Sequence, residues 1–487
     1  MNSARSGLPA PPRIPADPVV PDRSPGIDAV KAAVPRPRVP ERGPAPPWSA
    51  RRKAAAAVFA LGMSLVAYAY LAYFQRGIPW RFVDLDVYHD AGVKLRQAPS
   101  QVYTRDFGSR KLPFLYPPFA AYLFRWAAAG GVQVLAWGMT LLSIACLGVI
   151  AWLAAGLAGH RKRTRRIALT ATVAAMAIWT EPVQHNLFVG QVNLVLVTLV
   201  ITDFALPAGH WARGVGIGLA AGIKLTPGIF VLYLLITGRV RAACTAVAVF
   251  AGTVGAGWLL MPGASERFWT QGSLSGARLG PDYLASPYNQ SLLAAAVRLV
   301  GNVSVARALW MIASVVVLVA GFAAARVFAR HGRDLTGVLV VALVSLLVSP
   351  IAWTHHWVWL VVALVPLTAA AVSTPWRWWR APRLALVSVV LLCLPLPFVV
   401  TDHRLRVFSS PQPFWALVNQ WGASGYERRY SVCYVVGNAY VFTGLAALAV
   451  AVIAARRVTL GTRNAPVAPD VSRKVSVQPE SRAHSRR

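Results

Sequence analysis

Three aspartates follow directly on the first long apolar stretch of the sequence. Asp84, Asp86 and Asp90 lie in the segment DLDVYHD, in a chain that has 17 acidic residues against 49 basic ones. A carboxylate at the edge of the hydrocarbon loses part of its hydration, so its pKa rises toward the range that suits a general base. Asp is also common at helix starts, where it caps the backbone. Asp84 and Asp86 are the candidate bases, with capping as the alternative role.

Helical spacing divides these aspartates into two pairs. If residues 84–96 form a helix, Asp84 lies on one face with Tyr88, and Asp86 lies on another with Asp90. Only one of these faces can point toward an interior site, and the spacing alone does not choose between them.

A candidate cation lies much farther along the chain, in the segment IKLTP. A lysine within an apolar region is costly and usually functional, the alternative being that its side chain extends to the interface. Thr226 before Pro227 predicts a helix N-cap and first turn, so free N–H groups would point toward Lys224. Lys224 and Thr226 together predict a site for phosphate.

Further polar side chains stand at the predicted ends of apolar segments. His355 and His356 follow Ser349-Pro350, and adjacent histidines point in different directions, so one of them at most is expected to enter a site. Amide side chains can donate and accept, which suits sugar hydroxyls, although helix capping explains each of them as well; the candidates are Gln191, Asn193, Asn289 and Gln290. No metal-ligand spacing accompanies the histidines, so we expect neither a metal nor another cofactor.

These side chains suit the transfer of a group from a lipid phosphate to an alcohol. The alcohol needs a base, and the departing phosphate needs positive charge or hydrogen-bond donors. Such a phosphate is already a good leaving group, so a general acid is not essential. One carboxylate and one cation would suffice.

The bulk composition places these residues in a membrane. The 487 residues are 56% hydrophobic with a mean hydropathy of +0.51, and long apolar runs recur, which indicates a polytopic membrane protein. The net charge of +32 lies in short clusters between these runs and in the tails, which favours topology signals and anionic lipids over nucleic acid. The four cysteines lack the spacing of a zinc site or a disulfide framework.

We predict an all-α transmembrane bundle of about 10–12 spans, short or re-entrant helices included. Residues 1–53 and 456–487 are expected to be disordered basic tails on either side of a membrane domain at 54–455. The positive-inside rule places both termini in the cytoplasm and the polar motifs outside. In detail, we expect an interfacial segment at 116–126, an outer turn at 181–193 and a span at 384–400.

One apolar segment is predicted to enter the membrane and return. Read as a single span, residues 214–237 would leave Arg239 and Arg241 on the outer side, against the charge rule. Two half-helices at 214–222 and 227–237, each roughly 15 Å long, keep both ends inside. Lys224 would then lie at the tip, near the outer side.

Several motifs, in their order along the chain, resemble those of the polyprenyl-phosphate-mannose-dependent α-(1,2)-mannosyltransferases of actinobacteria. These enzymes form glycosyltransferase family 87, have the GT-C membrane fold and include those that extend phosphatidylinositol mannosides. The resemblance covers roughly residues 54–455. It rests on DLDVYHDAG, YPPF at 116–119, GQVNL at 190–194, GLAAGIKLTP at 218–227, SPYNQSL at 286–292 and SPIAWTHHW at 349–357.

The resemblance implies an inverting transfer with an α-(1,2) linkage on the outer face of the plasma membrane. Mannose would pass from a polyprenyl phosphate to a lipid-anchored mannoside or lipoglycan, without nucleotide sugar or metal. The family's catalytic aspartate corresponds to Asp84, and Asp86 remains the alternative. Its lysine falls on Lys224, and its histidine falls on His355 or His356. The basic tail of about fifty residues is longer than the family leads us to expect.

Two alternatives remain open at this stage. Some relatives use a polyprenyl-phosphate arabinofuranose donor, so the sugar is not fixed. A transporter or flippase of polyprenyl-linked sugars is the alternative from another class. Inverted repeats and charges along a central path would favour it, but the sequence has no convincing repeat, and its polar motifs gather on one side.

Overall fold

The computed structural model describes residues 47–74, 81–270, 281–373, 395–396, 412–413 and 432–463. These residues are almost entirely helical, with two pairs of two-residue antiparallel strands, β1 (Asp106–Phe107) with β2 (Leu112–Pro113) and β3 (Pro395–Leu396) with β4 (Gln412–Pro413). The predicted all-α membrane fold is confirmed. Most of the two expected tails and of the expected span at 384–400 lies outside the described residues.

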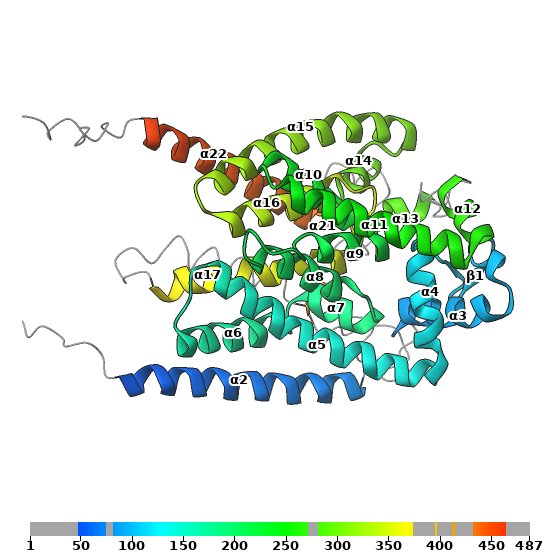
Figure 1. Cartoon of the computed structure of the whole chain (residues 1–487), viewed down its shortest axis with the longest axis horizontal. Helices are drawn as coiled ribbons and strands as arrows, with labels where there is room; N and C mark the ends of the chain where they lie inside the picture. Colours follow the sequence, from blue (N-terminus) through cyan, green and yellow to red (C-terminus); the bar gives the residue numbers. More distant parts are fainter. Residues whose placement is uncertain are drawn as a thin grey trace, which may run out of the picture. The chain divides into compact units, whose positions relative to one another are not determined.

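Figure 1 shows the arrangement of the helices along the chain. Nine helices of the described residues lie before residue 240: α2 (Pro47–Phe74), α3 (Val83–Gln97), α4 (Pro118–Ala127), α5 (Gly131–Leu157), α6 (Arg163–Ala177), α7 (Glu181–Val189), α8 (Asn193–Ala205), α9 (Val215–Ile223) and α10 (Ile229–Ile236). The later ones are α11 (Val240–Leu260), α12 (Pro262–Thr270), α13 (Pro281–Ala285), α14 (Leu292–Val300), α15 (Val303–Arg330), α16 (Asp334–Val348), α17 (Leu360–Ser373), α21 (Val432–Gly437) and α22 (Ala439–Arg463).

Six helical segments of the described chain are long and apolar enough to cross a membrane, or seven if α7 and α8 count as one broken span. These two helices meet at a bend of 119°. The predicted larger number included short and re-entrant helices, and the structure supplies these in α6, α16 and the α9–α10 pair. The chain is a multi-pass membrane protein.

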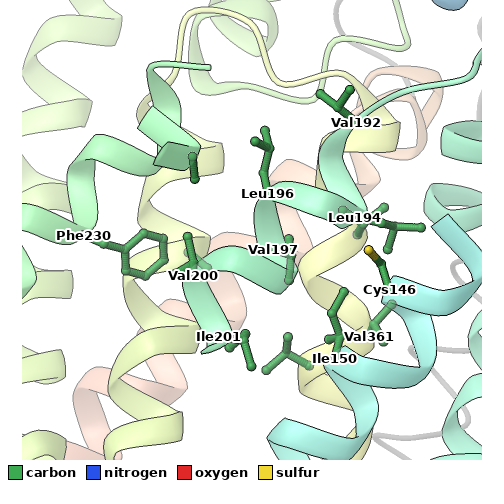
Figure 2. Close-up of a cluster of buried hydrophobic side chains, with 14 of the residues drawn as sticks. Cys146, Ile150, Val192, Leu194, Leu196, Val197, Val200, Ile201, Phe230 and Val361 are labelled. Carbon is green, nitrogen blue, oxygen red and sulfur yellow. The ribbon is translucent and has the colours of Figure 1, made fainter. Parts of the chain in front are cut away.

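Apolar side chains from four helices form one part of the core. Ile150 of α5, Leu194 and Val197 of α8, Phe230 of α10 and Val361 of α17 are buried (Figure 2). Branched and aromatic side chains of this kind lose their exposed surface completely, so they fix how the helices pack. This packing sets the position of α8, whose first residue belongs to the polar cluster described below.

The predicted re-entrant pair is present as α9 and α10. Arg213, just before α9, lies within electrostatic range of Arg239 and Asp334, and Arg239 follows α10. The guanidinium of Arg239 binds the Asp334 carboxylate at 2.6 Å. Because both ends of the pair meet these same charges, the chain enters and returns on one side, and Lys224 lies at the tip between the two helices.

Close approach of α9 to α11 depends on small residues. A Cβ added to Gly222 would lie 2.3 Å from the Thr253 hydroxyl, and one added to Gly218 would lie 2.5 Å from the Ala246 carbonyl oxygen. Both distances are shorter than van der Waals contact allows, so α9 can lie this near α11 only with glycine at these positions.

We therefore expect Gly222→Val to destabilise the protein by about 1–3 kcal/mol, the usual cost of overpacking a core. The added atoms would push the tip that carries Lys224 away from α11. Thermal unfolding of the detergent-purified variant measures this effect. Gly252→Ala is the matched control, because an added Cβ there meets nothing within 4 Å. Equal melting temperatures for both variants would contradict the expectation.

The expectation of an outer turn at 181–193 is wrong. Residues 181–189 form helix α7, and all nine of them are buried. The segment is polar because its side chains bond to one another and to other helices inside the bundle, not because it faces water. The predicted interfacial segment at 116–126 is close to α4, which leads into α5.

Candidate active site

Asp84 lies in the first turn of α3 and is tied to a chain of polar side chains. Gln191 Nε2 donates to Asp84 Oδ2 at 2.9 Å, and the Tyr116 hydroxyl donates to Gln191 Oε1 at 2.8 Å. The Tyr88 and Tyr116 hydroxyl oxygens are 2.6 Å apart. Since Tyr116 gives its proton to Gln191, Tyr88 donates to Tyr116. Gln191 and Tyr88 therefore serve here to hold the Asp84 carboxylate in place.

The surroundings of Asp84 raise its pKa. Burial disfavours the charged carboxylate and is the dominant cause, while the Gln191 hydrogen bond and the charges of His185 and Lys224 act in the opposite direction. A raised pKa suits a base that must accept a proton near neutral pH.

Asp86 and Asp90 point to a different part of the molecule. The Ser109 backbone N–H donates to Asp86 Oδ2 at 2.8 Å, and that of Gly108 donates to Asp90 Oδ2 at 3.1 Å. Both carboxylates thus hold the turn between β1 and β2. The two predicted faces of α3 are present, and the structure places Asp84 with Tyr88 on the inner one.

Lys224 joins the same cluster from the tip of the α9–α10 pair. Its ammonium donates to Asn193 Oδ1 at 2.9 Å and to His356 Nε2 at 3.0 Å, and it lies 5.5 Å from the centre of the Tyr116 ring. Because Nε2 of His356 accepts from a lysine, the imidazole carries its own proton on Nδ1. Lys224 and Asp84 interact electrostatically, so the predicted acid and cation share one site.

Thr226 is not the helix cap that the Thr-Pro step predicts. The 3₁₀ turn η3 (Thr226–Gly228) starts with Thr226 itself, Leu225 occupies the N-cap, and no side chain caps the turn. The turn begins one residue earlier than predicted, so the threonine lies inside it. Its side chain is exposed and lines a pocket together with Lys224, His356 and Asn193.

The two adjacent histidines have different surroundings. His356 lines the pocket and meets Lys224, whereas His355 is buried, with its ring 4.9 Å from both His185 and His356 in edge-on contacts. Both belong to the 3₁₀ segment η5 (Thr354–Trp359). As predicted, only one of them faces the pocket, and it is His356.

The four predicted amides separate into two pairs. Gln191 and Asn193 belong to the cluster, and Asn193 Nδ2 donates to the His355 carbonyl at 3.0 Å. Asn289 and Gln290 lie elsewhere and are occupied by backbone groups. Asn289 Oδ1 accepts from the Ala352 N–H at 2.9 Å. The Asn289 bond holds the segment that precedes η5, whereas Gln290 bonds the backbone of Gly437 and Tyr440, where α21 meets α22. These bonds do not support the expected contact with sugar hydroxyls.

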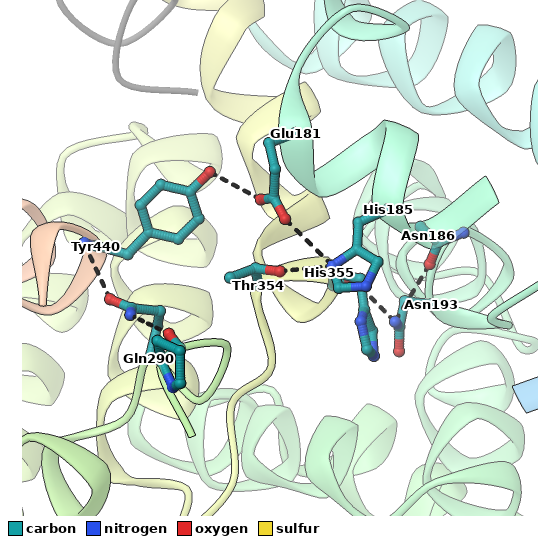
Figure 3. Close-up of polar contacts among 9 residues, drawn as sticks. Glu181, His185, Asn186, Asn193, Gln290, Thr354, His355 and Tyr440 are labelled. Carbon is teal, nitrogen blue, oxygen red and sulfur yellow. Dashed lines mark hydrogen bonds and ion pairs between the residues drawn. The ribbon is translucent and has the colours of Figure 1, made fainter. Parts of the chain in front are cut away.

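Polar residues that the sequence reasoning missed lie next to the cluster (Figure 3). His185 Nδ1 is 3.1 Å from Glu181 Oε1 and 2.7 Å from the Thr354 hydroxyl, and the Tyr440 hydroxyl donates to Glu181 Oε2 at 3.0 Å. The spacing of Glu181 and His185 by four residues could have revealed the pair, because it places both on one face of a helix. Reading the segment as a turn concealed it.

Comparison with known proteins identifies the family. The model of glycosyltransferase family 87 matches residues 114–350. A Mycobacterium tuberculosis polyprenol-phosphate-mannose-dependent α-(1-2)-phosphatidylinositol mannoside mannosyltransferase is 37% identical over 290 residues, 58% of this chain and 66% of that protein. A Mycolicibacterium smegmatis polyprenol-phosphate-mannose-dependent α-(1-2)-phosphatidylinositol pentamannoside mannosyltransferase is 34% identical over 347 residues, 69% of this chain and 80% of that protein.

No solved structure matches the chain. Two findings decide the family assignment: the extent of the match to the second relative, and the match of the family model across α4 to α16. The chain belongs to glycosyltransferase family 87.

Proposed function

We propose that this membrane glycosyltransferase moves mannose from a polyprenyl-phosphate-mannose donor to a lipid-anchored mannoside. The observation that carries the proposal is the meeting of Asp84 with Lys224 in one partly buried cluster, linked through Gln191, Tyr116 and Asn193. Two of the relatives are described as enzymes that use this donor on phosphatidylinositol mannosides, which supports the same substrate class here.

In the proposed reaction, Asp84 accepts the proton of an acceptor hydroxyl as its oxygen attacks the anomeric carbon. The new bond to that carbon forms as the bond to the phosphate oxygen breaks, and the electron pair leaves with the phosphate. Lys224, with His356 beside it, stabilises the charge that develops there. Attack opposite the leaving group inverts the anomeric centre, so a β-linked donor gives an α-linked product.

A second, apolar pocket supports a lipid donor. It lies between α16, α17 and α22, and its walls include Leu343, Ala363 and Gly444. Leu346 and Trp359 belong to this pocket and to the polar pocket at Lys224. A polyprenyl phosphate needs this combination, because its phosphate requires a cation and its chain requires an apolar surface.

The basic clusters support an active site on the outer face of the plasma membrane. The RRK run at 51–53 opens α2, the RKRTRR run at 161–166 joins α5 to α6, and Arg239 follows the returning helix α10. Asp84 follows α2, and Lys224 is at the opposite end of the α9–α10 pair from Arg239. By the positive-inside rule, this distribution supports a cytoplasmic location for the clusters and an outer location for the site.

Purified protein in detergent, given a labelled donor and a phosphatidylinositol mannoside, should form a mannosylated product that an α-(1,2)-specific mannosidase cleaves. Polyprenyl-phosphate-arabinofuranose is the matched donor control and should give no product. Transfer from the arabinofuranose donor alone would overturn the choice of sugar. Movement of the donor across vesicles without transfer would instead favour the flippase alternative.

A further inference from the structure

The chain leaves α16 at Ser349 and runs without a helix through residues 350–353 to η5. Residue 350 is a proline, which disfavours a helical conformation in the residue before it, and Ser349 is extended, with ψ 137°. The backbone groups of residues 350–353 therefore need partners from elsewhere in the chain. Two residues of this segment, Ile351 and Ala352, line the polar pocket together with Lys224.

The partners come from the segment that precedes α14. The Gln290 N–H donates to the Ala352 carbonyl at 2.8 Å, and Asn289 lies opposite Trp353 in an antiparallel bridge. The two segments thus pair as neighbouring strands of a sheet do, although each is too short to form a strand. The pairing gives residues 350–353 a fixed support on the side away from the pocket.

The side chain of Asn289 completes this support. It is fully buried; its Oδ1 accepts from the Ala352 N–H at 2.9 Å, and its Nδ2 donates to the Pro350 carbonyl at 3.3 Å. A primary amide carries a donor and an acceptor on one planar group, so it can bond an N–H and a C=O of the same segment at once. Asn289 therefore satisfies two backbone groups within the wall of the pocket.

The same wall continues into the residues that meet Lys224. The Thr354 N–H donates to the Tyr288 carbonyl at 2.9 Å, and the His356 N–H donates to the Trp353 carbonyl at 2.7 Å. His356 Nε2 in turn accepts from the Lys224 ammonium at 3.0 Å. The position of His356 therefore depends on how the preceding segment is held.

We propose that Asn289 is a positioning residue for departure of the donor phosphate: its amide holds residues 350–353 as a wall of the polar pocket and so sets where His356 meets Lys224. The inference rests on the proposed function, in which these two groups stabilise the departing phosphate. Asn289 is itself held from α14, because the Arg298 guanidinium donates to its carbonyl at 3.0 Å.

The test is Asn289→Leu, which keeps the branched shape of the side chain and removes both bonds to the wall. We expect kcat for mannose transfer to fall by about 10–100-fold, since a misplacement of about 1 Å can cost this much. The decisive measurement compares polyprenyl-phosphate-mannose with a donor that carries fluorine next to the phosphate ester and leaves more readily. The ratio of the fluorinated rate to the unmodified rate should rise in the variant, because a poorly stabilised phosphate gains more from being a better leaving group.

Gln290→Met is the matched control. Gln290 is the next residue and is equally buried, but its amide donates to the Gly437 carbonyl at 2.9 Å and accepts from the Tyr440 N–H at 3.2 Å, on the side of α21 and α22 (Figure 3). Methionine keeps the length of the side chain and removes these bonds. We expect a lower melting temperature with the wild-type ratio between the two donors, because a smaller folded fraction slows both donors equally.

A second pair of variants keeps the test available should Asn289→Leu not accumulate. The Ser291 hydroxyl donates to the Pro350 carbonyl at 3.1 Å and caps α14 by accepting from the Ala294 N–H at 3.1 Å. Asn302 caps α15 in the same way. Ser291→Ala loses a cap and a bond to the wall, whereas Asn302→Ala loses a cap. We expect the donor ratio to rise in Ser291→Ala and to stay unchanged in Asn302→Ala.

The proposal is overturned if Asn289→Leu, or Ser291→Ala in its place, keeps the wild-type donor ratio whatever its rate, or if the matched control raises the ratio as much. A failure of the proposed function gives a different result. In that case, the wild-type protein would transfer no mannose from either donor, and the positioning role would fall with it.

Discussion

Asp84→Asn should lower the rate of mannose transfer by about 10²–10⁴-fold, the range that general-base catalysis contributes. The amide has nearly the shape of the carboxylate and can still meet Gln191, so the helix and its contacts should persist. It cannot accept the proton of the acceptor hydroxyl. Initial rates with purified variant, donor and acceptor measure the loss, and the melting temperature checks that the fold is kept.

Asp86→Asn is the matched control for this prediction. It makes the same substitution two residues away, at a carboxylate that binds the Ser109 backbone and not the cluster. We expect it to retain most of the activity, with a small loss of stability from the weaker hydrogen bond at the β1–β2 turn. Loss of activity in Asp86→Asn with full activity in Asp84→Asn would reverse the assignment of the base.

Lys224→Met should lower kcat by about 10²–10³-fold, which is typical of removing one donor to a developing oxyanion. Methionine fills a similar apolar volume, so the tip of the α9–α10 pair should keep its position, but the charge beside the departing phosphate is lost. Single-turnover rates with bound donor isolate this step. A donor with a better leaving group should recover part of the rate in the variant, because it needs less stabilisation.

Lys224→Arg tests whether charge alone is sufficient. Arginine keeps the charge, but its planar donors cannot reproduce both contacts of the ammonium with Asn193 and His356. We expect an activity between those of the wild type and Lys224→Met. If Lys224→Met were as active as the wild type, the lysine would have no part in phosphate departure.

Much of this fold could be predicted because hydropathy and charge report directly on membrane helices. The apolar runs predicted the long helices, and the positions of Arg239 and Arg241 predicted the re-entrant pair. In the structure, both ends of this pair lie near Asp334. Helical spacing separated Asp84 from Asp86, although only the tertiary contacts show which face turns inward.

The incorrect predictions have a common physical cause. Glu181 and His185 are polar and were interpreted as part of a solvent-exposed turn, yet both are buried, and their partners include Tyr440 of α22 and Thr354 of η5. Asn289 and Gln290 read as sugar ligands, yet their amides bind backbone groups of other segments. Each of these side chains has at least one partner more than forty residues away in the sequence, which local sequence patterns cannot reveal.

Helix α10 returns to the side where α9 begins, so an ion pair holds the α9–α10 pair at the end opposite Lys224. The Arg239–Asp334 bond joins the end of α10 to the start of α16, and Lys224 lies at the other end of α10. Ionic contacts at the end of the pair farthest from Lys224 therefore help to set the position of this ammonium. Changes in charge where α10 ends and α16 begins would therefore shift Lys224 from a distance.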